Sequence, residues 1–323
     1  MDKNKIIKLV KELLKILIAI SIGLPMYHIA RIFDLRIVFL FHQISDKPDY
    51  FSKAGNLNIK PKRFTKIIEI IIKYFEVVDD YKFFNQNLKK FRNKPLALIT
   101  FDDGYFEAIE ESYKISLKYN FPIFHFINTE YIEYPKKYTS KYSPAMEYIK
   151  CIENKKYKKE NVTQTIKKIN YLKGESKYPK RSSISFIKSL KNNKLIFCSH
   201  GHNHIKYFDR HNSDNIYKDF FKSKKIIEKN KFNNSYFAFP FGKVDKKIYG
   251  FLRKISKNKV YFFLGMGAFN NPKTMRNRRL VKRVNITEYE KSLIRILYRI
   301  SISIALSTIP KIKNFFTDEK IYH

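Results

Sequence analysis

The sequence predicts an α/β fold in which strands and helices alternate around a mainly parallel sheet, either open or closed into a barrel. Short apolar runs rich in β-branched and aromatic residues, each bounded by turn residues, predict the strands. Amphipathic patterns between them predict the helices. The expected strands are Leu35–Phe41, Leu96–Phe101, Pro122–Ile127, Leu195–Cys198, Tyr236–Phe239, Val260–Leu264 and Leu280–Ile286. The expected helices are Pro61–Phe75, Tyr105–Tyr119, Ser182–Leu190, Asp214–Asn230 and Lys246–Lys257.

The same patterns divide the chain of 323 residues into three parts. Residues 35–288 carry the alternating strands and helices. A polar, lysine- and tyrosine-rich helical insertion at about 131–180 interrupts them after the third strand. Insertions of this kind usually lie at a rim and shape a groove. Basic, apolar segments flank this domain at 1–34 and 289–323.

The charge balance is strongly positive, with 65 Lys and Arg against 29 Asp and Glu, a net charge of +36. Such a balance favours an anionic partner, either nucleic acid, an acidic glycan or anionic lipid headgroups. The lysines are spread along the whole chain, however, which also fits a general compositional bias. No nucleic-acid-binding motif is recognised, so nucleic acid is not expected as a partner. The oligomeric state is left open.

The N-terminal segment, residues 1–34, leaves three interpretations open. A basic start and the apolar run Ile16–Leu24 fit a signal peptide or signal anchor, but this run is shorter than the ~20 residues that cross a bilayer. Pro25, His28 and Arg31 are expected to end it. The second interpretation is a helix packed on the protein's own core, and the third is a basic amphipathic helix on a membrane surface. One stripe of the helix carries Ile6, Leu9, Leu13, Leu17 and Ile20.

The C-terminal segment, residues 289–323, is again apolar and basic and contains a proline break. Two such flanks in one cationic chain favour peripheral attachment to an anionic membrane surface. The sequence does not indicate which side of the membrane.

Residues 98–104 read LITFDDG, an apolar strand that ends in two adjacent aspartates. Carboxylates at a buried strand end repel each other and lose hydration, so a compensating charge is required. A divalent metal ion supplies one. In a barrel of parallel strands, catalytic residues gather at the carboxyl ends of the strands, which is where Asp102 and Asp103 lie.

A second cluster, FCSHGHNHIKYFD, also follows an apolar strand and contains His200, His202 and His204. A single histidine on a strand is most often a core residue, but three within five residues favour metal ligation. Neutral imidazole and carboxylate together suit zinc or a related divalent ion. We therefore expect Asp103, His200 and His204 to bind the metal and His202 to point away. Asp102 would then be a general base for an attacking water.

Four motifs in order carry a resemblance to a known family. They are LFHQIS at Leu40–Ser45, TFDDG at Thr100–Gly104, SHGHNH at Ser199–His204 and FAFPFG at Phe237–Gly242. Over roughly residues 35–286 the chain resembles the polysaccharide deacetylases, the NodB-like family that acts on N-acetylated sugars. The resemblance implies a distorted (β/α) barrel that hydrolyses the acetamide of N-acetylglucosamine-type units.

The resemblance also implies roles for single residues. Asp102 matches the family's catalytic base, and Asp103 with the two histidines of the second motif matches its metal ligands. Phe241 matches the position whose backbone N–H holds the oxyanion, between Pro240 and Gly242 at the substrate site. Zinc is the expected ion, with cobalt, nickel or manganese as alternatives.

The sequence departs from the family pattern at two points. Ala238 occupies a position where many members carry an arginine that orients the catalytic aspartate, and we expect Arg283 to contact Asp102 instead and to lie with the substrate-binding residues. A surface salt bridge is the alternative for Arg283. The family's late Leu-x-x-His motif is not evident, so His42 is the candidate general acid, with a structural hydrogen bond as its alternative. His125, inside the third strand, is expected to be structural.

The sequence thus predicts a metal-dependent hydrolase that removes acetyl groups from N-acetylated sugars of a surface or lipid-linked polysaccharide. Two alternatives stay open. One is a degenerate member of the family that binds glycan with little turnover, and the other is an amidase that acts on a different small amide.

Overall fold

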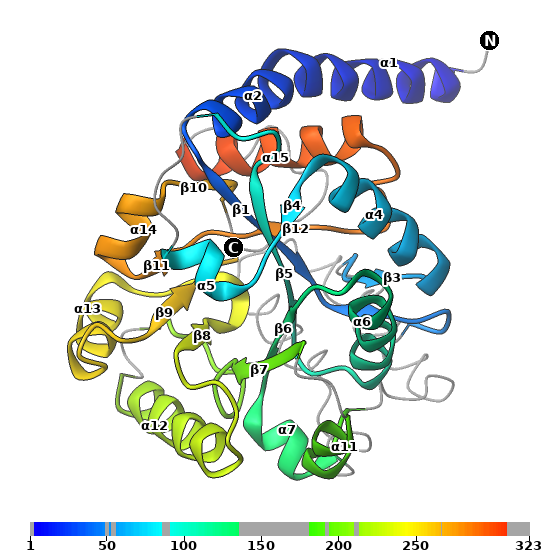
Figure 1. Ribbon diagram of the computed structural model, residues 1–323. Helices are drawn as coiled ribbons and strands as arrows, with labels where there is room; N and C mark the ends of the chain where they lie inside the picture. Colours follow the sequence, from blue (N-terminus) through cyan, green and yellow to red (C-terminus); the bar gives the residue numbers. More distant parts are fainter. Residues whose placement is uncertain are drawn as a thin grey trace.

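A curled sheet forms the centre of the protein, and helices cover its outside (Figure 1). The computed structural model describes residues 3–48, 52, 56–85, 91–135, 181–190, 194–209, 213–265 and 267–308. The strands run in the order β10-β1-β5-β6-β7-β8-β9-β11, and β12 lies beside β1. Because β11 and β12 follow each other closely in the chain, the sheet nearly closes on itself. The predicted (β/α) barrel is confirmed.

The barrel strands are parallel to their neighbours except where β10 pairs with β1. They comprise β1 (Arg36–Phe41), β5 (Leu96–Asp102), β6 (Ile123–Ile127), β7 (Leu195–Ser199), β8 (Tyr236–Ala238), β9 (Tyr261–Phe263), β10 (Phe269–Asn270), β11 (Leu280–Val281) and β12 (Val284–Asn285). A short β4 (Glu76–Val77) pairs with the start of β5, and β2 (Gln43–Ile44) pairs with β3 (Asn58–Ile59) in a separate sheet.

The prediction of one continuous strand at Leu280–Ile286 is wrong, since two short strands occupy this stretch. The backbone of Lys282 bonds to a side chain instead of a neighbouring strand. Its N–H donates to Asn270 Oδ1 at 2.8 Å, and its carbonyl accepts from Asn270 Nδ2 at 2.9 Å. This interruption lets the next side chain, Arg283, turn into the barrel.

Five predicted helices are present within one or two residues of their expected ends. They are α4 (Pro61–Tyr74), α6 (Phe106–Tyr119), α11 (Ile184–Ser189), α12 (Ser213–Lys229) and α13 (Lys246–Ile255). Ser183 caps α11 by accepting from Phe186 N, and Asp245 caps α13 by accepting from Lys247 N. Shorter helices that the patterns did not indicate are α5 (Asp80–Asn85), α7 (Thr129–Glu133), α14 (Pro272–Arg278) and the 3₁₀ turn η3 (Pro240–Gly242).

Alternation along the strands decides which side chains face the barrel interior. Val38 and Leu98 belong to the cluster that fills the barrel, whereas Phe41 and Phe101 stack with each other and pack against Phe64 of α4 outside it. Two-residue periodicity therefore points the residues that follow Phe41 and Phe101 inward at the carboxyl end of the barrel.

The predicted insertion at about 131–180 lies mostly outside the described residues. Its two ends are described, and they meet the barrel at the same place. The chain leaves through α7, and it returns at Arg181, which pairs with Tyr105 in an antiparallel bridge.

The N-terminal segment is one continuous helix that consists of α1 (Lys3–Ile18), a π turn η1 (Ala19–Gly23) and α2 (Leu24–Ile32). The expectation that Pro25 ends the apolar run is wrong. The π turn, in which Leu24 N–H bonds to Ala19 O, shifts the hydrogen-bond ladder just before the proline and accommodates it. As a result, Leu9–Ile32 forms a 24-residue helical stretch that is long and apolar enough to cross a membrane.

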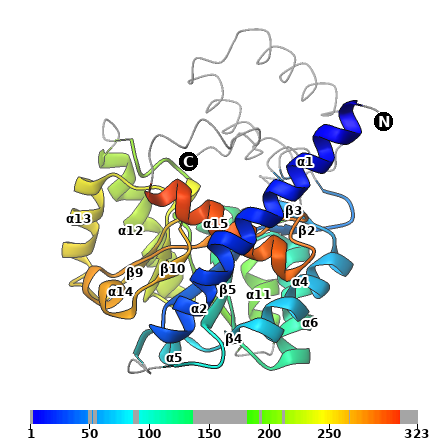
Figure 2. The ribbon, with the colours of Figure 1, turned by 90° about the horizontal axis from the view of Figure 1, so that it is seen from above.

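The C-terminal helix α15 (Leu293–Thr308) packs across this N-terminal helix (Figures 1 and 2). The crossing is close because Gly23 has no side chain: a Cβ there would lie 2.6 Å from Leu297 O. Ala19 and Tyr27 on one helix and Ile300 on the other belong to the same apolar cluster as the outer face of the barrel. The two ends of the described chain therefore share one core with the barrel.

Candidate functional site

The functional residues predicted from the sequence meet at the carboxyl end of the barrel. Register along the parallel strands pairs Phe41 with Phe101 and Ser199 with Phe237. The residues that follow these positions, including His42, Asp102 and His200, therefore emerge at the same end of the barrel, from β1, β5 and β7.

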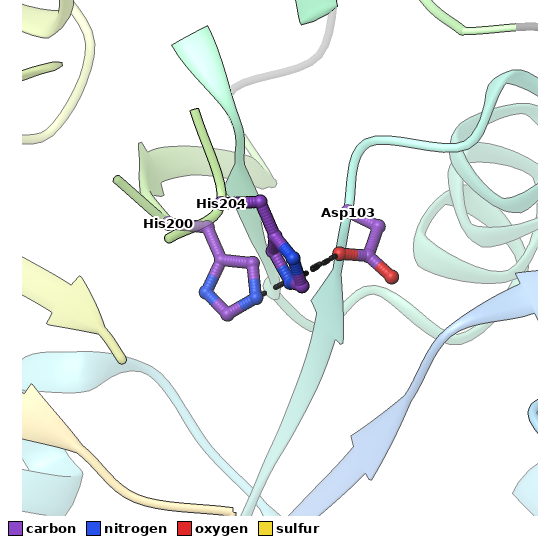
Figure 3. A group of neighbouring side chains, drawn as sticks. All are labelled: Asp103, His200 and His204. Atoms are coloured by element: carbon purple, nitrogen blue, oxygen red, sulfur yellow. Dashed lines mark ion pairs between the residues drawn. The ribbon is translucent and has the colours of Figure 1, made fainter. Parts of the chain in front are cut away.

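Asp103, His200 and His204 converge on one point (Figure 3). One ligand atom from each lies within 4.8 Å of the others, and all three residues are buried. Asp103 Oδ1 is 3.4 Å from His204 Nε2 and 3.7 Å from His200 Nε2. Two ligands that bind zinc tetrahedrally at about 2.1 Å lie about 3.4 Å apart, so these distances suit a single ion.

The chemistry of the three donors also fits a divalent cation. Asp103 Oδ1 is buried and accepts no hydrogen bond from the described residues. His200 Nδ1 is 2.9 Å from Ala238 O, and because a carbonyl only accepts, Nδ1 carries the proton. The lone pair of His200 is then on Nε2, which faces Asp103. A backbone carbonyl that fixes a histidine tautomer in this way is typical of metal sites.

The pKa values of these groups place them in the forms that bind metals. Burial lowers the pKa of His200 to about 4, against the opposing effect of Asp102, so its imidazole is neutral at neutral pH. Burial alone would raise the pKa of Asp103, but His204, Arg181 and His200 together lower it to about 2. The site therefore presents a carboxylate and a neutral imidazole.

Three non-glycine residues of the site have left-handed backbone conformations, with φ of 74° at Asp103, 54° at His204 and 59° at Phe241. Such conformations cost about 1–3 kcal/mol each and persist only where the surroundings impose them. Their concentration here is typical of a functional site.

Arg181, which the sequence analysis missed, helps to hold Asp103 in its strained conformation. Its Nη1 donates to Asp103 O at 2.7 Å. The guanidinium lies over the rings of Tyr105 and Tyr131, 4.0 and 5.0 Å from their centroids. No motif marked this residue, because it reaches the site only when the chain returns from the insertion.

Asp219 of α12, also missed, shapes the histidine loop. Its carboxylate accepts from the backbone N–H of His202 at 2.8 Å and of Asn203 at 2.7 Å. Gly201 has φ of 79°, and a Cβ there would lie 2.7 Å from Asp219 Oδ2, so glycine is required. A signal for Asp219 was available, since it is a carboxylate at helical spacing from the apolar residues Ile216, three positions before it, and Ile226, seven positions after it.

Asp102 forms a bidentate ion pair with Arg283. The guanidinium donates from Nη1 to Oδ1 at 2.7 Å and from Nη2 to Oδ2 at 2.8 Å, while its Nε donates to Leu264 O. The contact expected between these residues is present. Arg283 is fully buried, however, so the structure favours a positioning role over the glycan contact expected from the sequence.

The pKa of Asp102 results from opposing effects. Burial would raise it, but Arg283, His200 and His42 lower it below the ordinary value of an aspartate. Asp102 is therefore ionised at neutral pH, with Oδ2 3.6 Å from His200 Nε2. An ionised carboxylate beside a candidate metal position can accept a proton from water.

His42 directly follows β1, where the pairing of Phe41 with Phe101 places it level with Asp102, and it is half-buried. Its Nδ1 is buried and has no hydrogen-bond partner among the described residues, so the alternative of a structural hydrogen bond gains no support at that atom. Burial lowers its pKa, and the nearby carboxylates of Asp102 and Asp103 oppose this shift.

The other two histidines of interest are held away from the metal position. His202 Nδ1 is 2.8 Å from Thr129 Oγ1. His125 Nε2 is 2.7 Å from Ser112 Oγ, and its ring stacks on Phe101. Burial lowers the pKa of His125 to about 3. The structural role expected for His125 agrees with these contacts.

The Pro-Phe-Gly turn lies next to the histidines. Pro240 is buried, and the ring of Phe241 is 4.6 Å from that of His204. Gly242 has φ of 65° and packs directly on Gly265, where a Cβ on Gly242 would lie 2.3 Å from Gly265 Cα. Glycine is therefore needed for this turn to pack against the loop that follows β9.

Comparison with protein families agrees with this arrangement. A family model described as polysaccharide deacetylase matches residues 89–260, more than half of the chain. The chain belongs to the polysaccharide deacetylase family. It is therefore a hydrolase of carbon–nitrogen bonds, and carbohydrate de-N-acetylation is its reaction class. Among curated protein sequences, none matches this deacetylase.

Solved structures show the same fold. The Streptococcus pyogenes deacetylase PplD in complex with acetate is 14% identical, with a TM-score of 0.56, and the match covers 82% of this chain and 98% of that one. IcaB from Ammonifex degensii is 13% identical, with a TM-score of 0.54 and coverage of 82% and 97%. BC0361, a polysaccharide deacetylase from Bacillus cereus, is 13% identical, with a TM-score of 0.54 and coverage of 82% and 69%.

Proposed function

We propose that this deacetylase depends on a divalent metal and removes acetyl groups from N-acetylated sugars of a surface or lipid-linked polysaccharide. The observation that carries the proposal is the convergence of Asp103, His200 and His204 beside Asp102, a carboxylate held in place by Arg283. Zinc is the expected ion, because the donors are one carboxylate and two imidazoles, with cobalt, nickel or manganese as alternatives.

In this proposal the side chains divide the reaction between them. A divalent ion held by the three ligands would polarise the acetamide carbonyl and acidify water. Asp102 accepts a proton from water as the water oxygen attacks the carbonyl carbon. The backbone N–H of Phe241 donates to the oxygen on which negative charge develops.

Proton return completes the reaction. The C–N bond breaks, and the sugar nitrogen must gain a proton to leave as an amine. His42, next to Asp102, supplies it: a neutral imidazole can accept the proton from Asp102 at one nitrogen and donate another from the opposite nitrogen. The products are acetate and a free amino sugar. Acetate is also the compound named with the Streptococcus pyogenes structure.

The direct test of this function is hydrolysis of N-acetylglucosamine oligosaccharides by the full-length protein loaded with zinc or cobalt. We expect acetate and free amine to appear in equal amounts and to stop when a chelator removes the metal. Oligosaccharide binding without acetate release would identify a glycan-binding protein instead. Acetate release from small amides alone would identify an amidase.

Replacing Arg283 with glutamine is expected to move the acid limb of the pH–rate profile to higher pH. Asp102 must be ionised to accept a proton, and Arg283 lowers the pKa of Asp102, so its removal raises that pKa. An opposite charge at this distance is worth about 1–3 pH units. The profile of kcat/KM against pH measures the shift.

Arg283→Lys serves as the matched control, since it keeps the positive charge but loses the second hydrogen bond to the Asp102 carboxylate. It should show a smaller shift of the acid limb. Metal content and thermal unfolding of both variants show whether they are folded. A lower plateau with an unmoved acid limb in Arg283→Gln would mean that Arg283 only supports the fold.

A further inference from the structure

The outward face of the N-terminal helix is a continuous strip of exposed aliphatic side chains, which we call the aliphatic strip. Each of its members is between 41% and 62% exposed. They are Ile6, Ile7, Leu9, Val10, Leu13, Leu14, Leu17, Ile20 and Ile22. The barrel does not cover them, because α1 projects beyond it (Figures 1 and 2). A soluble monomer rarely leaves so many large aliphatic groups together in water.

The opposite face of the same helix is fixed to the rest of the protein. Ala19, Gly23, Tyr27 and Ala30 recur at intervals of four or three residues and are buried. Gly23 touches Leu297 of α15, and Tyr27 Oη donates to Tyr74 O at 2.8 Å. The helix therefore lies along the surface of the molecule, with one face docked and the other outward.

The charges on this helix match an anionic surface. Its sequence carries lysines at positions 3, 5, 8, 11 and 15, and its one acidic residue, Glu12, pairs with Lys15 and with Arg295 of α15. A second copy of the chain would bring another net charge of +36 and be repelled. Anionic lipid headgroups attract these lysines, and acyl chains accept the aliphatic strip.

We propose that the aliphatic strip seats this deacetylase in one leaflet of an anionic membrane, with the N-terminal helix parallel to the bilayer plane. Leu9–Ile32 is long enough to span, but a spanning orientation would carry α15 and the docked barrel edge into the hydrocarbon. The in-plane orientation leaves the packing of α15 and the barrel against the N-terminal helix unchanged. It goes beyond the proposed function and does not depend on it.

Tryptophan scanning tests this orientation, since the chain contains no tryptophan. Single variants Leu9→Trp, Leu13→Trp, Leu17→Trp and Ile20→Trp are mixed as full-length proteins with phosphatidylglycerol–phosphatidylcholine vesicles. Lipids brominated at different acyl depths quench their fluorescence. We expect blue-shifted emission and the same shallow depth at all four positions. Phe221→Trp on α12, which lies away from α1 in both views, should not be quenched (Figures 1 and 2).

A depth that increases steadily from one position to the next would overturn the in-plane orientation in favour of a span. Blue-shifted emission without quenching, together with a doubled mass in solution, would show that a second copy covers the aliphatic strip.

A charge variant provides an independent measurement. Leu13→Glu with Leu17→Glu should weaken vesicle binding by about 10-fold or more. The double variant loses two aliphatic contacts with the acyl chains and brings two negative charges to the anionic headgroups. Leu117→Glu with Phe221→Glu changes the net charge equally at exposed positions of α6 and α12 and should bind normally. Equal losses in both double variants would mean that net charge alone drives binding.

Discussion

Replacing Asp102 with asparagine is expected to lower kcat by about 10²–10⁴-fold, the usual contribution of a general base. Asparagine has nearly the same shape but cannot accept the proton that leaves the attacking water. Because Asp103, His200 and His204 are untouched, the protein should still bind one metal ion. The experiment compares the rate of acetate release with metal content from elemental analysis.

A matched control separates lost chemistry from lost folding. Asp80 is also an aspartate that holds a hydrogen bond, from Tyr236 Oη at 2.7 Å, but it lies at the start of α5, outside the site. Asp80→Asn should keep its activity. Asp102→Asn also leaves Arg283 buried without its carboxylate, so its unfolding temperature must be measured. A folded, metal-loaded Asp102→Asn with more than about a tenth of the normal rate would remove Asp102 from the base role.

The strands and the site could be predicted because their signals are local. The apolar run of β5 ends at adjacent aspartates, and that of β7 ends at clustered histidines. Two-residue alternation from Val38 and Leu98 already directs His42 and Asp102 inward, and parallel pairing then brings them together. A short window of sequence contains each of these signals.

Of the residues that hold the site in place, Arg181 could not be found in this way, and the contact of Arg283 with Asp102 was expected only because the sequence departs from the family pattern at Ala238. Arg181 reaches Asp103 O only after an insertion of about fifty residues, and Arg283 contacts Asp102 across 181 positions of sequence. Neither residue lies in a local periodic pattern that indicates its partner. The break between β11 and β12, which lets Arg283 turn inward, depends on Asn270 from another strand. Long-range contacts of this kind become visible only once the barrel is assembled.

The N-terminal helix could likewise be predicted only in part, because its packing also depends on residues distant in the sequence. Its apolar stripe was evident from periodicity, but its continuation past Pro25 depends on a π turn that periodicity does not reveal. Its docked face depends on α15, which comes more than 250 residues later. The sequence could therefore define an amphipathic helix without showing which face would remain free.

Replacing His204 with asparagine is expected to weaken zinc binding by more than about 100-fold, beyond the 10–100-fold cost typical of residues that only support a ligand. His204 Nε2 lies 3.4 Å from Asp103 Oδ1 and completes the three donors. Its loss leaves one imidazole and one carboxylate. Zinc affinity measured by competition with a chelator tests this without any assay of activity, and acetate release should fall in parallel.

His202→Asn is the decisive comparison, because it changes a buried histidine of the same loop to the same residue. Its Nδ1 contacts Thr129 Oγ1, and its backbone N–H is held by Asp219. Zinc affinity should therefore change by no more than about 10-fold, the lower end of the range for supporting residues. If both variants lost zinc to the same extent, the histidine loop would act only as a folded unit. A loss confined to His204→Asn would instead mean that His204 itself binds the metal, and that the site does not depend on the number of histidines in the loop.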